Sequence, residues 1–282
     1  MGQSTASVKL QTVSILGCGW YGLELAKALV AKGYTVKGSS TTAEKLPLLS
    51  SHQIQPFLVS FEQEEESYDP LFFQTDVLFI CIPPKRSSSQ QSAYLHKIQR
   101  ICNAATLHKT SNLVFISSTS VYGDHNEEVT EISIPIPETA SGNAILEAEN
   151  LLKKQSGFHC TILRFAGLVG PGRHPGRFFA GKKELPNGQA PINLIHLTDC
   201  IGISLQLIEQ QLFGHTINAC SPDHPAKQDF YVAATLNAGL PLPEFKNERL
   251  KWKLISTIHT PLLNYTYQLA NWKNWLNEDN LL

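Results

Sequence analysis

The chain has 282 residues, of which 42% are hydrophobic and 17% charged, a balance that predicts a folded globular protein with a sizeable core. A formal net charge of −1 provides no bulk attraction to nucleic acid or to an anionic membrane, and no apolar run is long enough to span a bilayer. The six cysteines form no C-x-x-C pair and the ten histidines show no metal-ligand spacing. Because the first nine residues also lack the apolar core of a signal peptide, we expect a cytoplasmic protein with reduced thiols and no metal.

An apolar run, three spaced glycines and a helical pattern follow one another directly in residues 13–31. Gly17 permits a tight turn out of a strand, Gly19 lets the backbone approach a pyrophosphate, and Gly22 lets the following helix pack closely on the strand. The N-terminus of that helix then faces the anion. The pattern predicts a dinucleotide-binding loop made of Gly17, Cys18, Gly19, Trp20, Tyr21 and Gly22.

A second strand is expected to begin at residues 34–36, and the residues after it indicate which dinucleotide binds. In NAD-binding units an acidic residue near this strand end binds the ribose 2′-hydroxyl. Here Ser39, Ser40 and Thr41 occupy that place, and Lys45 follows. Small hydroxyls and a cation suit a 2′-phosphate better than an acid would, so we predict NADP, with NAD as the alternative. Ser and Thr also make ordinary helix N-caps, which is the structural alternative.

Buried strands alternate with helices through the rest of the first half. The expected strands are residues 76–82, 112–116 and 160–165, and the expected helices are 90–108 and 139–154. This alternation predicts an α/β fold with a Rossmann-type, doubly wound parallel sheet in residues 1–168. The end of the first of these strands is expected to contact the cofactor through Cys81, Ile82 and Pro83.

The composition changes after residue 168. A loop rich in glycine, proline and arginine covers residues 170–177, a short strand is expected at 193–196, and helices at 197–211 and 228–239. A further strand is expected at 215–219. We interpret residues 169–282 as a smaller substrate lobe, with a segment of about 191–213 returning to the sheet.

Four segments resemble extended short-chain dehydrogenases/reductases, the NAD-dependent epimerase/dehydratase superfamily. They are the glycine motif and residues 117–124, 163–172 and 193–196. Residues 164–182 are similar to those of the YeeZ-like atypical branch in particular. The resemblance covers the chain from residue 13 to about 243. It implies a Rossmann domain that binds NAD(P) and a C-terminal lobe for the substrate.

The family's chemistry uses a Ser or Thr, a Tyr that acts as general acid and base, and a Lys four residues after the Tyr. Ser118 matches the first of these positions. The Tyr position holds Ser141 and the Lys position holds Ile145. A serine hydroxyl is a far poorer acid than a phenol, and isoleucine supplies neither charge nor hydrogen bond. Leu16 also replaces the first glycine of the family's loop.

Three single residues could contribute chemistry, and each has a structural alternative. Tyr122 follows the matching serine by four residues and could act as a substitute acid, or could simply pack at the strand end. His196 ends a strand that should face the cleft, but a lone histidine often has a structural role. Cys18 could have a lowered pKa at the helix N-terminus, or could serve by being small beside the pyrophosphate.

A basic loop contains Arg173, His174 and Arg177. It could bind an anionic, phosphorylated or nucleotide-linked substrate, or it could be a solvated surface loop. Two classes of function therefore remain. The protein could be an oxidoreductase or epimerase-like enzyme with an unusual acid, acting on a small molecule. Alternatively, it could be a non-catalytic dinucleotide-binding sensor or interaction protein.

Overall fold

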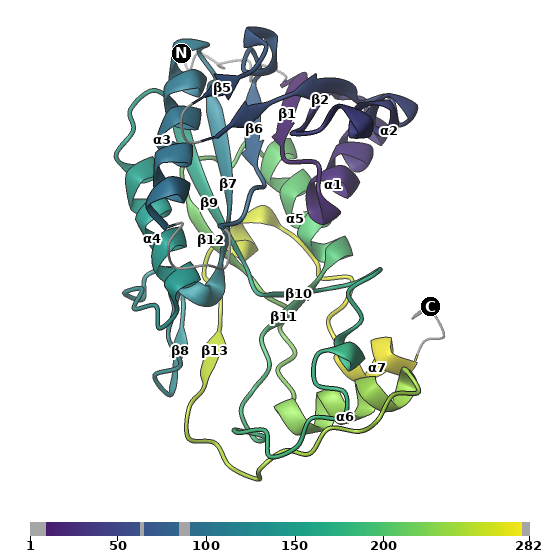
Figure 1. Cartoon of the computed structure of the whole chain (residues 1–282). Coiled ribbons are helices and arrows are strands. Elements are labelled where there is room, and N and C mark those ends of the chain that lie inside the picture. Colours follow the sequence, from purple (N-terminus) through teal and green to yellow (C-terminus); the bar gives the residue numbers. More distant parts are fainter. Residues whose placement is uncertain (1–9, 63–64, 85–90, 278–282) are drawn as a thin grey trace, which may run out of the picture.

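The computed structural model describes residues 10–62, 65–84 and 91–277, and within them a seven-stranded parallel sheet forms the centre of the molecule (Figure 1). The strand order is β12-β9-β7-β6-β1-β2-β3, and every neighbouring pair is parallel. The strands are β1 (Thr12–Leu16), β2 (Thr35–Ser40), β3 (Gln55–Leu58), β6 (Val77–Ile80), β7 (Asn112–Ser118), β9 (His159–Phe165) and β12 (Thr216–Ala219).

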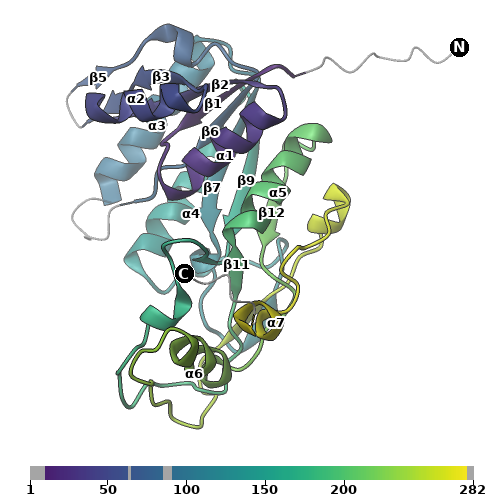
Figure 2. The ribbon, with the colours of Figure 1, turned by 90° about the vertical axis from the view of Figure 1, so that its right-hand side faces the viewer.

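Helices cover both faces of this sheet. On one face α1 packs against α5, and on the other α3 packs against α4; Figure 2 shows α1 and α5 in front of the strands. The strand β6 reads Val-Leu-Phe-Ile and is buried throughout, as expected for a strand covered on both sides. The predicted Rossmann-type α/β fold is therefore confirmed. The helices are α1 (Trp20–Ala31), α2 (Leu46–Ser51), α3 (Gln91–Leu107), α4 (Ala140–Lys153) and α5 (Leu197–Glu209).

A second group of elements lies beyond the carboxyl ends of the strands (Figure 1). It contains α6 (Lys227–Asn237), α7 (Trp272–Asn277) and the parallel pair β10 (Gly167–Val169) and β11 (Leu194–His196). Its apolar cluster includes the side chains of Phe230, Tyr231 and Trp272, and is separate from the cluster around the sheet. This part of the molecule can therefore present side chains to the edge of the sheet where the strands end.

The C-terminal segment, residues 253–277, contacts both the sheet domain and the second group of elements. The strand β13 (Lys253–Ile255) pairs with β8 (Glu127–Val129), and the short helix η6 (Thr260–Leu263) packs on α5. The buried carboxylate of Asp199 accepts hydrogen bonds from the Tyr265 hydroxyl and the Gln268 N–H, both at 2.7 Å. This carboxylate fastens the segment to α5.

Several strands differ from the sequence prediction. The second strand extends to Ser40 because Gly38 fits where a Cβ would lie 2.7 Å from Ile54 and 2.8 Å from the Cys18 sulfur. Glycine is a weak strand former, so the sequence prediction ended this strand before Gly38. The strands β3, β8 and β13 were not predicted. Among the described residues, no helix combines the length and apolar character needed to cross a bilayer.

Candidate dinucleotide-binding site

The order of the strands reverses at β1. From there the chain continues through β2 and β3 to one edge, whereas β6, β7, β9 and β12 build the other half of the sheet. In open α/β sheets, ligands bind outside the carboxyl ends of the strands at such a switch point. The glycine loop after β1 and residues 81–83 after β6 meet there.

The glycine loop has the geometry that a dinucleotide requires. Gly17 has φ +101°, a conformation that side chains disfavour. A Cβ on Gly22 would collide with the carbonyl oxygen of Gly17, so this glycine permits the close packing of α1 on the loop. A Cβ on Gly19 would meet no protein atom within 4 Å. The side of the loop at Gly19 is therefore open to a ligand.

The N-terminus of α1 suits an anion. Gly19 is the N-cap residue and no side chain caps the first N–H groups, which keeps these donors available. No acidic side chain stands in the first turn to repel a phosphate. The open face at Gly19 and these donors together fit the diphosphate of NAD(P).

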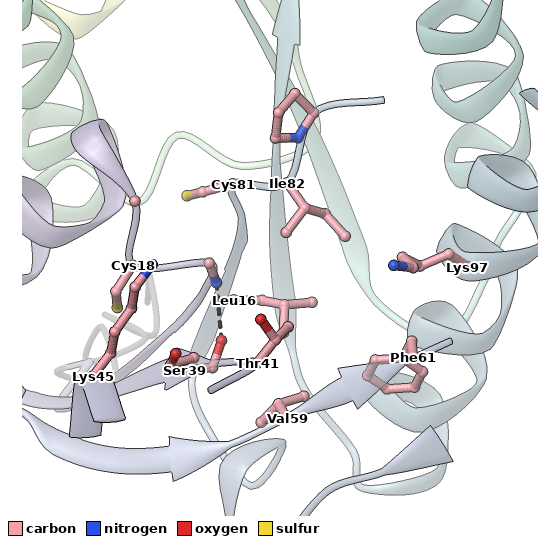
Figure 3. A pocket seen from close by; sticks show the side chains of 14 residues that line it. Leu16, Cys18, Ser39, Thr41, Lys45, Val59, Phe61, Cys81, Ile82 and Lys97 are labelled. Carbon is pink, nitrogen blue, oxygen red and sulfur yellow. Dashed lines mark hydrogen bonds between the residues drawn. The ribbon is translucent and has the colours of Figure 1, made fainter. Parts of the chain in front are cut away.

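A pocket of about 270 Å³ lies beside this loop (Figure 3). The structure brings to it residues that the sequence analysis proposed from three separate segments. These are Gly17, Cys18, Gly19, Ser39, Ser40, Thr41, Cys81, Ile82 and Pro83. The wall also includes Lys45, the cation expected after the second strand, and four residues that were not predicted: Leu16, Val59, Phe61 and Lys97. Val59, Phe61 and Lys97 carry no local motif, so only the packing of α3 and the segment after β3 places them there.

The hydroxyl groups at the end of β2 have different roles. Ser39 is buried, and its Oγ accepts a hydrogen bond of 2.9 Å from the Gly17 N–H, which fixes the glycine loop to β2 (Figure 3). The Oγ of Ser40 accepts from the Thr42 N–H at 3.0 Å. Thr41 and Lys45 are exposed at the pocket wall. The cation and the hydroxyl groups of residues 40 and 41 are thus the groups at this strand end that can meet a ligand.

The thiol of Cys18 is not activated. Burial raises the pKa of Cys18 to about 12, and a hydrogen bond with the backbone of Ser39 opposes this only in part. The possibility that the helix N-terminus lowers its pKa is therefore wrong, because loss of hydration outweighs the helix dipole. Cys18 stays a neutral, small side chain beside the loop.

Tyr21 and Trp20 connect the start of α1 to other parts of the fold. The Tyr21 hydroxyl lies 2.6 Å from that of Ser204 on α5, so its side chain is buried between helices and only its backbone N–H can serve a ligand. The Trp20 Nε1–H donates to the carbonyl oxygen of Pro171 at 2.7 Å. The guanidinium of Arg173 lies over the Trp20 ring, 4.3 Å from its centroid. The basic loop thus lies against the first residue of α1.

The rest of the basic loop turns toward the second group of elements. His174 caps the short helix η5 (Pro175–Arg177), where its Nδ1 accepts from the Gly176 N–H at 3.1 Å. The Thr235 hydroxyl on α6 donates to the carbonyl oxygen of Gly176 at 3.1 Å. Arg177 is exposed. Arg173 and Arg177 were expected to act together. The structure instead places Arg173 against Trp20 of α1 and Arg177 on η5, which contacts α6.

His196 also has a capping role. Its Nδ1 accepts from the Thr198 N–H at 3.2 Å at the start of α5, and its ring packs edge-on against Trp275. Burial lowers the pKa of His196 below its usual range. A Cβ on Gly170 would lie 3.3 Å from both the His196 Nε2 and Trp20, which places His196 next to the basic loop.

Tyr122 is buried and does not face a cleft. Its hydroxyl donates to the carbonyl oxygen of Thr130 at 2.8 Å and to the Asn218 side chain at 3.1 Å, and accepts from Arg164. Arg164 in turn forms a buried bidentate pair with Glu149, with distances of 2.9 and 2.5 Å. The suggestion that Tyr122 acts as an acid is therefore wrong, because its hydroxyl belongs to an enclosed network that holds strands and α4 together.

Ser118 ends β7, and its Oγ accepts from the Ser120 N–H at 3.1 Å. The start of α4 lies directly against this segment, because a Cβ on Gly142 would be 2.5 Å from the Ser120 carbonyl oxygen. Ser141, in the first turn of α4, is partly exposed, whereas Ile145 is buried. The first turn of α4 therefore adjoins the segment that Ser118 begins.

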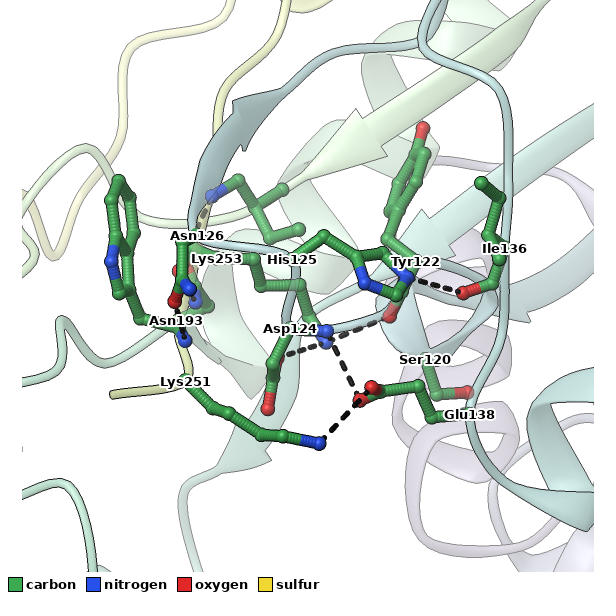
Figure 4. A network of polar contacts seen from close by, with 12 residues as sticks. Ser120, Tyr122, Asp124, His125, Asn126, Ile136, Glu138, Asn193, Lys251 and Lys253 are labelled. Carbon is green, nitrogen blue, oxygen red and sulfur yellow. Dashed lines mark hydrogen bonds and ion pairs between the residues drawn. The ribbon is translucent and has the colours of Figure 1, made fainter. Parts of the chain in front are cut away.

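A polar network follows this segment (Figure 4). The Lys253 Nζ donates to the Tyr122 carbonyl oxygen at 2.8 Å and to Asp124 Oδ1 at 2.9 Å, and Glu138 bridges the Asp124 N–H and Lys251. These contacts attach β13 to the loop after β7. No sequence pattern predicts these contacts, because the partners are far apart in the chain.

Comparison with known proteins agrees with this geometry. A family model described as NAD(P)H-binding matches residues 17–199. Protein YeeZ of Escherichia coli (strain K12) is 40% identical over 242 residues, which cover 84% of this chain and 88% of that protein. The uncharacterized UDP-glucose epimerase YtcB of Bacillus subtilis (strain 168) is 30% identical over 165 residues, which cover 51% of this chain and 52% of that protein.

Solved structures share the fold. UDP-glucuronic acid 4-epimerase from Bacillus cereus, in complex with NAD, has a TM-score of 0.77 at 20% identity, with 94% of this chain and 96% of that chain covered. The human epimerase family protein SDR39U1 with NADPH has a TM-score of 0.70 at 14% identity, with 95% and 98% covered. Together with the glycine loop, these findings show that the chain belongs to the NAD(P)H-binding family and is a relative of Protein YeeZ.

Proposed function

We propose that the protein is an NADP-dependent oxidoreductase of the epimerase/dehydratase type that acts on an anionic or nucleotide-linked small molecule. The observation that carries the proposal is the wall of the dinucleotide pocket at the end of β2. It presents Ser40, Thr41 and Lys45 where a carboxylate would favour NAD. A carboxylate there would repel a 2′-phosphate, whereas a cation and hydroxyl groups attract it. NAD is the alternative cofactor.

The substrate side of the proposal depends on charge and position. Arg177 is an exposed cation on η5, in the loop whose other end contacts the helix that follows the glycine loop. His174 and His196 lie in or beside this loop. Guanidinium groups bind phosphate and carboxylate with two parallel hydrogen bonds. The names of YtcB and of the Bacillus cereus enzyme make UDP-sugars the first substrates to test.

The proposed chemistry lacks the family's acid and base. Bound nicotinamide would supply hydride transfer. The Ser118 hydroxyl can donate a hydrogen bond to a substrate oxygen, and Ser141 offers a second hydroxyl in the first turn of α4, which adjoins the segment that begins at Ser118. Neither hydroxyl takes up a proton near neutral pH, and Ile145 offers no charge to lower a neighbouring pKa. We therefore expect slow turnover, or a proton acceptor that the substrate itself carries.

The second candidate is a non-catalytic dinucleotide-binding sensor or interaction protein. The observation that favours it is the same pair, Ser141 and Ile145, because loss of both groups removes acid/base catalysis while the glycine loop keeps its geometry. This candidate predicts cofactor binding without turnover.

Incubation with NADP⁺ or NADPH and a series of UDP-sugars, followed by nicotinamide absorbance and by product analysis, separates the two. Turnover supports the enzyme, and Arg177→Ala should then raise KM for an anionic substrate while leaving cofactor affinity unchanged. Cofactor binding without turnover of any anionic or nucleotide-linked compound would contradict the enzyme and support the sensor. Arg249→Ala is a control, since its guanidinium stacks on Trp252.

A further inference from the structure

The position of Arg173 is set by two contacts of its loop with Trp20, at the start of α1, and by one hydrogen bond within the loop. Its guanidinium lies 4.3 Å from the centroid of the Trp20 ring. The Trp20 Nε1–H donates a hydrogen bond of 2.7 Å to the carbonyl oxygen of Pro171, although the two residues are 151 positions apart. The Arg173 N–H closes a turn onto the Gly170 carbonyl oxygen at 2.9 Å, where Gly170 has φ +146°. The loop is therefore built to hold this side chain over Trp20.

The donors of Arg173 have no protein acceptor. Within residues 10–62, 65–84 and 91–277, its guanidinium makes no hydrogen bond or ion pair, and the residue is exposed. The ring of Trp20 supports one face of the guanidinium, while the N–H groups at its edge stay available. Stacking reduces the side-chain freedom that a bound anion would otherwise have to restrict. The guanidinium of Arg173 is thus held in one orientation with its donors free to bind an anion.

The side chain of Arg173 lies over the first residue of α1, at the N-terminus of that helix. Trp20 is the first residue of α1 and directly follows Gly19, where a Cβ would meet no protein atom within 4 Å. No acidic side chain occupies the first turn. The partial positive charge of the helix and the full charge of Arg173 thus act at the same place.

We infer that Arg173 is a cofactor-binding residue. Its guanidinium would donate hydrogen bonds to the diphosphate of the dinucleotide at the N-terminus of α1. This separates Arg173 from Arg177, which stays on η5 and is proposed to meet the substrate. The inference rests on NAD(P) binding, which the family shows, and not on the proposed reaction or substrate.

Calorimetric titration of Arg173→Gln with NAD⁺ and NADP⁺ tests this. Both dinucleotides carry the diphosphate, so the variant should weaken both by the same factor, about 10- to 100-fold, the scale of hydrogen bonds to a charged group. Arg177→Gln, the matched control from the same loop, should leave both affinities within about twofold. Arg173→Lys should restore part of the loss, since it keeps the charge but not the fork.

Three outcomes would overturn the inference. If Arg173→Gln leaves both affinities unchanged, the residue belongs to the substrate or to solvent. If it weakens NADP⁺ alone, the residue binds the 2′-phosphate. If Arg177→Gln causes an equal loss, the effect is general charge and not the Trp20 arrangement. Trp20→Phe, which keeps a ring but loses the bond to Pro171, should weaken both dinucleotides less than Arg173→Gln. Because turnover is not measured, the proposed reaction can fail while this inference stands.

Discussion

Gly19 and Gly22 belong to the same glycine motif, but replacing Gly19 should mainly prevent cofactor binding, whereas replacing Gly22 should mainly destabilise the fold. Gly19 has φ −86°, so a side chain causes no backbone strain, and its Cβ would meet no protein atom within 4 Å. The cost to folding is that of a poor N-cap residue, about 1 kcal/mol for valine. For a chain of this size that lowers Tm by roughly 2–4 °C. Gly19→Val should therefore fold.

The same side chain should prevent cofactor binding. Its methyl groups would occupy the open side of the loop, and a diphosphate could no longer approach the backbone N–H groups. Loss of two hydrogen bonds to a charged group, at roughly 1.5–3 kcal/mol each, weakens affinity by at least about 100-fold.

Gly22→Ala is the matched comparison. Its Cβ would collide with the Gly17 carbonyl oxygen and lie 3.1 Å from Ile15, so the loop itself must move. Such overpacking costs roughly 1–3 kcal/mol. Calorimetry with NADP⁺ and thermal melting of both variants measure the contrast. A folded Gly19→Val protein with unchanged dinucleotide affinity would refute the reasoning, because the site would then lie elsewhere.

Three further predictions follow from the site. The affinity for NADP(H) should exceed that for NAD(H) by roughly 1–3 kcal/mol in calorimetry, and Ser40→Asp should reverse the order by repelling the 2′-phosphate; equal affinities in the unmodified protein would contradict the cofactor choice. The double variant Ser141→Tyr, Ile145→Lys should raise turnover of any accepted substrate about 100-fold or more, if general acid/base catalysis is what the chain lacks, and melting would show whether it still folds. Because the folded pKa of His196 is lowered, its contribution to stability is full above the ordinary histidine pKa and is lost as pH falls through the folded value; His196→Asn, which can still cap α5, should flatten the fall in Tm on acidification below about pH 6.5, and an unchanged slope would exclude His196 as its source.

The alternation of strands and helices and the glycine loop could be predicted from the amino-acid sequence. Both are local properties. The run Val77–Ile80 is apolar because both faces of its strand are covered. The spacing of Gly17, Gly19 and Gly22 predicts, within six residues, a tight turn, a backbone open to a diphosphate and close packing of the helix on the loop. The prediction that Ser141 and Ile145 stand at the family's Tyr and Lys positions likewise comes from the chain alone.

The roles of single side chains, in contrast, depend on contacts that the sequence does not reveal. Tyr122 and Ser39 have ordinary local surroundings, yet the first is enclosed by Arg164 and the second holds the glycine loop. In the basic loop, Arg173 lies on Trp20, 153 positions earlier in the chain, whereas the turn that carries Arg177 is held by Thr235 of α6. Local patterns arise from neighbours along the chain, whereas these contacts exist only after the sheet has brought distant strand ends together.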